Sequence, residues 1–584
     1  MIVLGALLSA TVLTSLAAAQ STTDPRATLA PGLDNAGVAA NGVELLANRM
    51  KPPGFFNPAN PGDFGFVNSD LAFEGDFAFV GNFNGFQIYD ISNPADPTVR
   101  TAVVCPGGQG EVSVYRNLLF MSAEETRART DCGAPAAPAG SPLRFRGVRI
   151  FDISNLDAPV QVAAVQTCRG SHTHTLLKSP HDDANVYVYV NGTGGVRPAT
   201  ELAGCKPLPQ GTPLTTPQTD QELSQWRIEV IKVPLAAPQD AAVVSTPRLF
   251  ANEATGQINS LQNAPPTPQH PSGTNWSPSP SSDSCHDITT YPELDLAAGA
   301  CEGNGLLLDI KDPANPKRIA VAQDNRFAYW HGATFSNDGA KVVFTDEWGG
   351  GTAPRCRVTD DLSWGANAIY DIVDKQLVFR SYYKLPVAQT NQENCVSHLP
   401  SLIPVPGRDI MTQAWYQGGV SVIDFTDSAN PKEIAYYDRG PISATSLVLG
   451  GLWSSYYYNG AIYGSEIARG FDSWKLTPTA ELSVNEIAAA AEVELDRLTP
   501  QHQPKLVNEP SFAVVRSYRD QLERADAIDE KTLKQVDKFV DRAEQYTAAG
   551  KDAAAKAQLN AIANQLRGAQ YDALRAALRA LADA

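Results

Sequence analysis

The chain has 584 residues and a formal net charge of −17, from 46 basic and 63 acidic side chains. This charge argues against nucleic acid and anionic membrane surfaces as partners, because an acidic protein is repelled by both. The 44 glycines and 42 prolines indicate many turns, as in an all-β repeat protein.

The first 20 residues are apolar and carry no charged side chain. Three alanines, at positions 17–19, precede Gln20 and fit a signal-peptidase site. A transmembrane anchor is the alternative, but the run is short and no basic flank follows it. We therefore expect residues 1–20 to be a cleaved signal peptide, no membrane span afterwards, and a secreted or cell-surface protein.

We interpret residues 21–60 as an extended leader that wraps a neighbouring unit. After the leader, a strand followed by an Asn-Pro turn recurs along the chain. The first copy, GFQIYDISNPADP at 85–97, alternates apolar and polar side chains before its turn. Close copies occupy 147–159, 305–316 and 419–431. A unit that returns at long, fairly regular intervals indicates a repeat architecture.

Seven such units can be followed between residues 64 and 476, although three of them are degenerate. We therefore predict an all-β fold, a seven-bladed β-propeller of four-stranded blades over residues 61–478, with six or eight blades as alternatives. Radial packing of blades removes most free sheet edges. We expect the strand after each Asn-Pro turn, such as 99–104, to open the next blade.

The repeated strand and turn resemble the LVIVD repeat of exported and surface β-propeller proteins of prokaryotes. The resemblance covers the propeller region. It implies a propeller outside the cytoplasm and no particular activity.

Eight cysteines, an even number with no CxxC pair, agree with export. Their connectivity does not follow from spacing, since eight cysteines allow about 105 pairings. We predict that sequence neighbours pair, so that each bridge staples a long surface loop. The predicted bridges are Cys105–Cys132, Cys168–Cys205, Cys285–Cys301 and Cys356–Cys395.

The composition changes after residue 478 to alanine-rich, charged segments. Val514, Val515, Tyr518 and Leu522 recur at helical spacing, and Gly550 predicts a helix end. We expect residues 479–584 to form a small C-terminal α-helical bundle. It resembles helical modules appended to secreted bacterial proteins, and serves either cell-surface attachment or stability.

Four of the eight histidines occupy matching positions, near the start of the first strand of a blade. They are His174, His286, His331 and His398. In a propeller this strand lines the central channel, so the imidazoles would converge and hold iron, copper, zinc or manganese. The competing interpretation is a set of channel histidines that bond only to water and backbone.

Three other residues belong to this hypothesis. His172 is an alternative to His174, because both lie on one face of the same strand. Glu111 and Asp70 hold the matching position in the second and first blades, where they could complete the ligand set or orient the imidazoles. The arrangement is similar to that of carotenoid-cleaving oxygenases, which hold iron with four histidines from different blades. That similarity implies an open coordination position for oxygen.

Loops at one mouth of the channel supply candidate catalytic residues. Glu347 follows the second strand of the fifth blade, and Glu466 holds the same place in the seventh. Either could act as general acid or base, or be a solvated turn carboxylate. Arg326 and Tyr329 could line a pocket for a sugar or an aromatic ring.

Three functions fit these patterns. The first is an exported metalloenzyme with an axial transition metal, acting as Lewis acid or redox centre on a small-molecule or glycan substrate. The second is a non-catalytic surface propeller that binds glycan or protein. The third is a metal-free polysaccharide lyase or hydrolase that uses histidine, tyrosine and arginine.

Overall fold

The computed structural model describes residues 20–133, 135–261 and 282–584. The predicted signal peptide lies outside the described residues except for Gln20, so it stays a prediction. Among the helices of the described residues, none is long and apolar enough to span a membrane.

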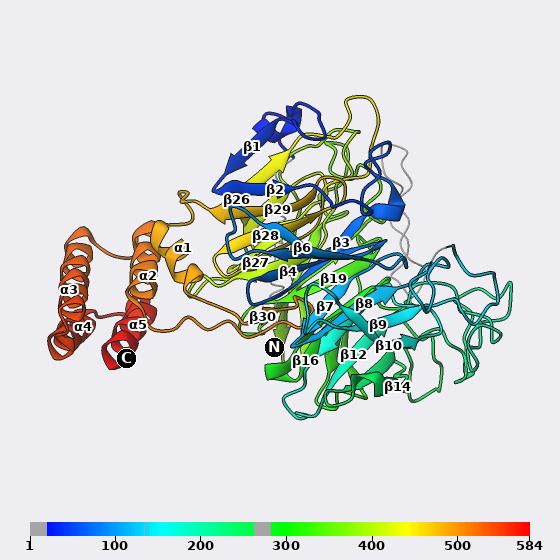
Figure 1. The fold of residues 1–584 in the computed structure, drawn as a ribbon. Helices are drawn as coiled ribbons and strands as arrows, with labels where there is room; N and C mark the ends of the chain where they lie inside the picture. The colour runs from blue at the N-terminus through cyan, green and yellow to red at the C-terminus, as the bar shows by residue number, and fades with distance from the viewer. Residues whose placement is uncertain (1–19, 134, 262–281) are drawn as a thin grey trace, which may run out of the picture.

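Seven antiparallel sheets form a closed ring, which confirms the seven-bladed propeller (Figure 1). The first strands of neighbouring blades contact one another and line the axis. Strands are given from the inner to the outer one. The first blade consists of β3 (Asn68–Glu74), β4 (Phe77–Asn82), β5 (Gly85–Asp90) and β6 (Thr98–Val104), and the second of β7 (Val112–Tyr115), β8 (Leu118–Ala123), β9 (Gly147–Asp152) and β10 (Val160–Gln166). The third blade consists of β11 (Thr173–Leu177), β12 (Asn185–Asn191), β13 (Glu229–Pro234) and β14 (Ala242–Ser245), and the fourth of β15 (Asp287–Tyr291), β16 (Leu296–Cys301), β17 (Asn304–Asp309) and β18 (Lys317–Ala322).

The last three blades follow the same order, and two of them include strands from the N-terminus. The fifth blade consists of β19 (Trp330–Phe335), β20 (Lys341–Asp346), β21 (Asn367–Val373) and β22 (Gln376–Tyr383). The sixth consists of β23 (Pro400–Ile403), β24 (Ile410–Ala414), β25 (Val420–Asp424), β26 (Lys432–Arg439) and β1 (Val38–Asn41). The seventh consists of β27 (Leu452–Tyr458), β28 (Ala461–Glu466), β29 (Gly470–Leu476) and β2 (Val43–Arg49). Short 3₁₀ turns occupy η1 (Pro25–Thr28), η2 (Phe64–Phe66), η3 (Pro238–Asp240), η4 (Pro292–Leu294) and η5 (Ala569–Tyr571).

The repeated motif has a local physical basis in its turn and its glycine. Asp90 Oδ1 accepts a hydrogen bond from the backbone N–H of Ser92 at 3.0 Å, and Asp152 does the same with Ser154 at 2.8 Å. Such Asx turns reverse the chain after the third strand. At Gly85, where φ is 142°, an added Cβ would lie 2.0 Å from the carbonyl oxygen of Val103. The outer strand therefore approaches too closely for any other residue.

The strand after this turn belongs to the same blade, which corrects one expectation. Residues 99–104 lie in β6, which pairs with β5 and forms the outer strand of the first blade. The expectation that they open the next blade is wrong. A short turn is enough to bring the next strand antiparallel to the strand before it. The strand after the Asn-Pro turn therefore pairs within the same sheet, as its outer strand, and does not start the next blade.

The ring is closed by pairing strands from both ends of the chain. β2 pairs with β29 and gives the seventh blade its outer strand, while β1 adds a fifth strand to the sixth blade. Both strands lie within residues 21–60, the expected leader. The N-terminal segment is therefore part of two sheets and covers their edges.

The alternating apolar side chains of the repeat form the packing between blades. Phe86 and Ile88 of the first blade are fully buried against Phe151 of the second, and the rings of Phe86 and Phe151 lie 5.1 Å apart.

All four predicted disulfides are confirmed: Cys105–Cys132, Cys168–Cys205, Cys285–Cys301 and Cys356–Cys395.

The predicted C-terminal helices are confirmed, and they lie beside the ring (Figure 1). They are α1 (Val484–Ala491), α2 (Phe512–Arg524), α3 (Glu530–Ala548), α4 (Asp552–Gln565) and α5 (Asp572–Asp583). Val515, Val540, Leu559 and Leu574 share one buried core among the last four helices.

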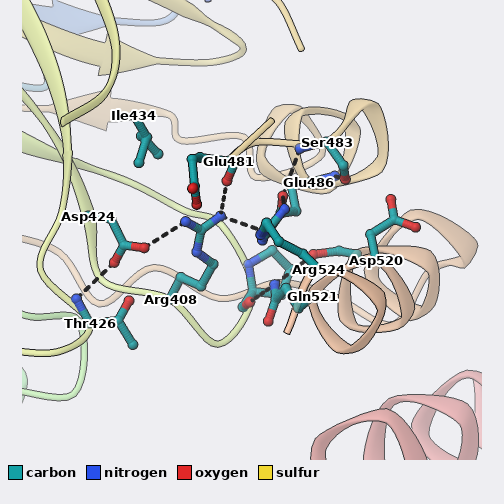
Figure 2. Close-up of polar contacts among 12 residues, drawn as sticks. Arg408, Asp424, Thr426, Ile434, Glu481, Ser483, Glu486, Asp520, Gln521 and Arg524 are labelled. Atoms are coloured by element: carbon teal, nitrogen blue, oxygen red, sulfur yellow. Dashed lines mark hydrogen bonds and ion pairs between the residues drawn. The ribbon is translucent and has the colours of Figure 1, made fainter. Parts of the chain in front are cut away.

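An ion network attaches these helices to the sixth blade (Figure 2). Arg408, only 8% exposed, lies between Asp424 of β25 at 2.6 Å and Glu486 of α1 at 2.8 Å. Arg524 of α2 reaches the same Glu486 carboxylate at 2.6 Å. Glu486 also completes the capping box that starts α1 at Ser483. One buried carboxylate therefore connects the propeller with two helices.

The segment between α1 and α2 crosses one end of the axial channel, which we call the floor (residues 497–508). β30 (Arg497–Leu498) pairs with β3 along the inner edge of the first blade. Beyond it, side-chain and backbone hydrogen bonds join the floor to further blades through Thr499 to Val114, Gln501 to Thr290, Gln503 to Phe335 and Asn508 to Pro404. The floor contacts the far ends of the inner strands, whereas the candidate histidines lie near the starts of those strands.

Candidate metal centre on the propeller axis

Three buried side chains converge at the start of the inner strands. His286 precedes β15, His331 lies in β19, and Glu347 follows β20. One ligand atom from each lies within 4.8 Å of the other two, and all three residues are at most 6% exposed. The rings of His286 and His331 are 3.8 Å apart, measured between centroids. Imidazole nitrogen with a carboxylate oxygen is a donor set that suits zinc, iron, copper or manganese.

His398, just before β23, extends this group. Its ring centroid lies 4.2 Å from that of His331. Its Nδ1 is hydrogen-bonded to the carbonyl oxygen of Trp453, which leaves the Nε2 lone pair available. That Nε2 is 3.7 Å from Glu347 Oε1, and His331 Nε2 is 3.5 Å from Glu347 Oε2. Glu347 therefore lies against two of the imidazoles.

The fourth imidazole in the row is that of His172, whose centroid is 4.5 Å from that of His286. His172 Nδ1 is hydrogen-bonded to Glu124 Oε2 at 2.7 Å. His174 lies elsewhere, with Nε2 2.7 Å from Ser113 Oγ and Nδ1 2.8 Å from Ser122 Oγ. Both His174 nitrogens are thus engaged, and His172 completes a row of four from the third to the sixth blade, which we call the histidine row. The members of the histidine row are His172, His286, His331 and His398.

Burial keeps three members of the histidine row neutral. It lowers the pKa of His286 and His331 well below the usual value, helped by the neighbouring histidines, and lowers the pKa of His398 to about 3. Burial also lowers the pKa of His172, but the charge of Glu124 outweighs it and the net shift is upward. Burial raises the pKa of Glu347 to about 7.

Three members of the histidine row each have one ring nitrogen that lacks a partner within the described residues. His286 Nδ1, His331 Nδ1 and His398 Nε2 are buried without a hydrogen bond. A buried polar atom without a partner is unfavourable, and such atoms mark places where a further ligand binds. Neutral imidazoles with free lone pairs fit a transition-metal ion.

A cavity of about 380 Å³ opens onto the histidine row. His172, His286, His331 and Glu347 line its inner end, while Tyr329 and Tyr416 flank them. The remaining lining is mainly apolar, with the polar side chains of Gln109 and Thr352 among it, and its large apolar side chains are those of Phe64, Phe83, Leu449, Trp453 and Ile467. A volume of this size, apolar with a few convergent polar groups, is typical of a small-molecule site.

The other predicted site residues divide between this cavity and other places. Tyr329 and Glu347 belong to the cavity. Arg326 has a side chain 43% exposed and paired with Asp361 at 3.2 Å. Glu466, the last residue of β28, is buried and accepts backbone N–H groups of Gly451, Ala468 and Arg469.

Glu111 and Asp70 lie deeper on the axis. Glu111 Oε2 accepts a hydrogen bond from the backbone N–H of His174 at 3.0 Å. Burial raises the pKa of Glu111, and the charges of Asp287 and Asp70 raise it further. Neither belongs to the group of ligand atoms around Glu347. Tyr416 and Trp453 were missed from the sequence, because they lie outside the repeat motif and carry no local signal.

The fold and the site define a class, a seven-bladed propeller with an axial histidine-lined cavity. The LVIVD repeat family matches residues 68–103, which are β3 to β6 of the first blade. The protein is therefore a seven-bladed β-propeller whose first blade matches the LVIVD repeat. No curated protein matches the chain.

Two of the solved structures that are similar to the chain are named as lactonases, and both similarities are distant. The periplasmic gluconolactonase of Pseudomonas aeruginosa is 11% identical, with a TM-score of 0.39, over 70% of this chain and 100% of that one. A candidate 6-phosphogluconolactonase of Bacteroides uniformis is 8% identical, with a TM-score of 0.37, over 68% of this chain and 89% of that one. Similarity at this level transfers no activity to the chain.

Proposed function

We propose that the protein is an exported metalloenzyme that holds one transition-metal ion through the histidine row and acts on a small molecule in the cavity above it. The observation that carries this proposal is the convergence of four imidazoles from adjacent blades, three of which have a buried nitrogen without a partner. The four disulfides support export, since such bonds persist in oxidising compartments.

The bound metal would supply Lewis-acid or redox chemistry to the substrate. Glu347 is the residue of this chain suited to hold and release a proton there, because its pKa is about 7 and its carboxylate faces His331 and His398. The phenol of Tyr416 donates a hydrogen bond to Glu347 Oε1 at 2.5 Å and fixes the orientation of the carboxylate.

The cavity favours one kind of substrate. The aromatic side chains of Phe64, Phe83 and Trp453 line it, beside the buried histidines. A compact molecule with an apolar or aromatic part would bury most of its surface in a space of this size. A long glycan would not fit inside it, so the small-molecule alternative is the one that the geometry supports.

Elemental analysis of protein purified without a histidine tag tests the proposal. We expect about one transition-metal ion per chain, as four nitrogen donors bind a single ion. The double variant His286→Ala and His331→Ala should lose the metal and keep its far-UV circular dichroism spectrum. His181→Ala is the matched control, because His181 is 45% exposed and pairs with Asp295 at the surface.

Two outcomes would overturn the proposal. Metal-free protein whose melting temperature ignores added Fe(II), Cu(II), Zn(II) and Mn(II) would leave a non-catalytic binding propeller. Full metal content in the double variant would place the ion elsewhere.

A further inference from the structure

The carboxylate of Glu124 lies behind the imidazole at one end of the histidine row. Glu124 directly follows β8 in the second blade, and His172 precedes β11 in the third. Glu124 Oε2 lies 2.7 Å from His172 Nδ1, and the two side chains are 13% and 19% exposed. A carboxylate oxygen can only accept a hydrogen bond, so Nδ1 is the donor and carries the proton. The lone pair of a neutral His172 is therefore on Nε2.

The backbone of the third blade holds this carboxylate in place. Glu124 Oε1 accepts hydrogen bonds from the backbone N–H groups of Thr193 and Gly194, at 2.8 and 2.7 Å. An added Cβ at Gly194 would lie 2.8 Å from the carbonyl oxygen of Arg169 and 3.3 Å from Glu124 Cγ, so only glycine allows this close approach. The guanidinium of Arg169 fixes the same loop, since it donates to the carbonyl oxygens of Thr193 and Gly194 at 3.0 and 2.8 Å. The position of the carboxylate is thus set independently of the imidazole.

Two other glutamates occupy the same place in their blades and make a different set of contacts. Glu302 and Glu347 directly follow the second strands of the fourth and fifth blades. Glu347 faces the Nε2 atoms of two imidazoles. Glu302 accepts two backbone N–H groups, at 3.1 and 3.4 Å, and no hydrogen bond joins it to a histidine within the described residues. Glu124 therefore combines backbone support like that of Glu302 with a direct contact to the histidine row.

We propose that Glu124 is a positioning residue of the metal centre, which holds His172 in the tautomer that presents Nε2 to the ion. This inference rests on the metal centre proposed above. His172 lines the cavity beside His286, whereas Glu124 is not among the residues that line it. His398, at the other end of the histidine row, is also bonded through Nδ1, to the carbonyl oxygen of Trp453. An acceptor of this kind fixes the orientation of a metal-binding imidazole and makes it a stronger donor.

The hydroxyl of Thr193 is the competing partner of His172. Its Oγ1 lies 3.0 Å from Nδ1. The same hydroxyl donates to Glu124, with both carboxylate oxygens at 3.2 Å. The contact between Nδ1 and the carboxylate is shorter, and an ionised acceptor forms the stronger hydrogen bond. The carboxylate therefore decides the tautomer, and the hydroxyl helps to hold the carboxylate.

Glu124→Gln tests this role with almost no change of shape. The amide oxygen would accept the two backbone N–H groups, which leaves the NH₂ group to donate to His172 Nδ1. The imidazole proton then moves to Nε2, where it competes with the ion. We expect the affinity for zinc(II), measured against a chromophoric chelator, to fall about 10- to 100-fold. The unfolding midpoint in urea shows whether the variant is folded.

Glu302→Gln is the matched control. It removes a carboxylate from the same place in another blade, one that has two backbone donors and no imidazole. Its zinc affinity should equal that of the wild type. Equal losses in Glu302→Gln and Glu124→Gln would mean that the ion senses only the negative charge, and would overturn the proposal. If Glu124→Gln does not fold, Gly194→Ala weakens the support of the carboxylate and should lower zinc affinity in the same direction.

A double-mutant cycle separates positioning from a structural role. In the His172→Ala background, Glu124→Gln should change zinc affinity by less than about twofold, because its effect passes through His172. A loss of the same size in both backgrounds would overturn the role of Glu124, as would unchanged affinity of Glu124→Gln when the wild type binds zinc(II). Wild-type protein that binds neither zinc(II) nor iron, copper or manganese would overturn the metal centre itself, and this role with it.

Discussion

Two neighbouring histidines differ in what their removal should cost, and they provide the sharpest test of the site. His172 lies against His286 at the cavity wall, whereas His174 is enclosed between Ser113 and Ser122. We predict that His172→Ala lowers metal affinity and leaves the fold intact. We predict that His174→Ala lowers the free energy of unfolding and leaves metal affinity unchanged.

The magnitudes follow from the contacts of each ring. His174 is 1% exposed, and truncation of a buried side chain to alanine costs about 2–5 kcal/mol. Ser113 would lose its partner, at about 1–3 kcal/mol, while Ser122 keeps a hydrogen bond with Ser171 at 2.9 Å. We expect a loss of about 4 kcal/mol for His174→Ala.

His172→Ala should cost much less stability. Its side chain is 19% exposed, and Glu124 keeps backbone hydrogen bonds from Thr193 and Gly194. We expect a loss of about 1 kcal/mol. Metal affinity should fall at least about 100-fold. This is more than the loss expected when a residue that only hydrogen-bonds a metal ligand is removed.

Both variants would be stripped with a chelator and titrated with the metal that the wild-type protein carries. Their unfolding midpoints in urea give the stability difference, compared at equal protein concentration. The reasoning is refuted if His174→Ala loses metal at normal stability while His172→Ala retains it. That result would put His174 in the ligand set.

The remaining predictions concern the attachment of the C-terminal helices. Arg408→Met should lower the free energy of unfolding by about 3 kcal/mol, because it leaves Asp424 as a mostly buried carboxylate without its cation; urea unfolding measures this, and an unchanged midpoint contradicts it. Burial raises the pKa values of Asp424 and Glu486, but their hydrogen bonds and the neighbouring arginines outweigh it. Both pKa values therefore lie below the usual range. Their stabilisation is therefore complete above the unfolded values of 3.8 and 4.5 and is lost as the pH falls further. Helix release measured by limited proteolysis should increase below that range in the wild type and hardly in Arg408→Met. Deletion of residues 497–584 should lower the melting temperature of the propeller itself, which a detachable module would not do.

The sequence was enough to predict the repeated part of the fold, because its signals are local. The Asp90 turn, the close approach at Gly85 and the buried pair Phe86 and Ile88 act within one blade or between neighbours. Each can be recognised in a window of a few residues. The number of blades followed from the spacing of such windows. The disulfide pairs did not; they were predicted on the assumption that sequence neighbours pair, which the structure confirms.

The parts that escaped the sequence depend on contacts between distant residues. β2 pairs with β29, more than 420 positions apart for Leu45 and Trp474, and Gln501 reaches Asp70 across 431 positions. Neither strand nor floor carries a pattern that names its partner. The leader and the floor therefore contact the ring through pairings that no local pattern predicts.

The site shows the same division at the level of single side chains. The repeat register identified His286, His331 and His398, because equivalent positions in adjacent blades meet at the axis. It could not separate His172 from His174, since both side chains project to one face and only Ser113 and Ser122 decide which is enclosed.

Glu347 and Glu466 look equivalent in the sequence, but the strand register places them one position apart. Glu466 ends β28 and opposes Leu452, just as Asp346 ends β20 and opposes Trp330, whereas Glu347 follows Asp346. In the seventh blade the loop turns its N–H groups onto Glu466, which consumes the carboxylate as an acceptor. In the fifth blade Glu347 accepts from the phenol of Tyr416 instead and stays against the imidazoles. Asp346 accepts the backbone N–H groups of Ala328, Tyr329 and Gly365, as Glu466 accepts three in its own blade. A shift of one position along the chain therefore separates a structural carboxylate from one that faces the cavity.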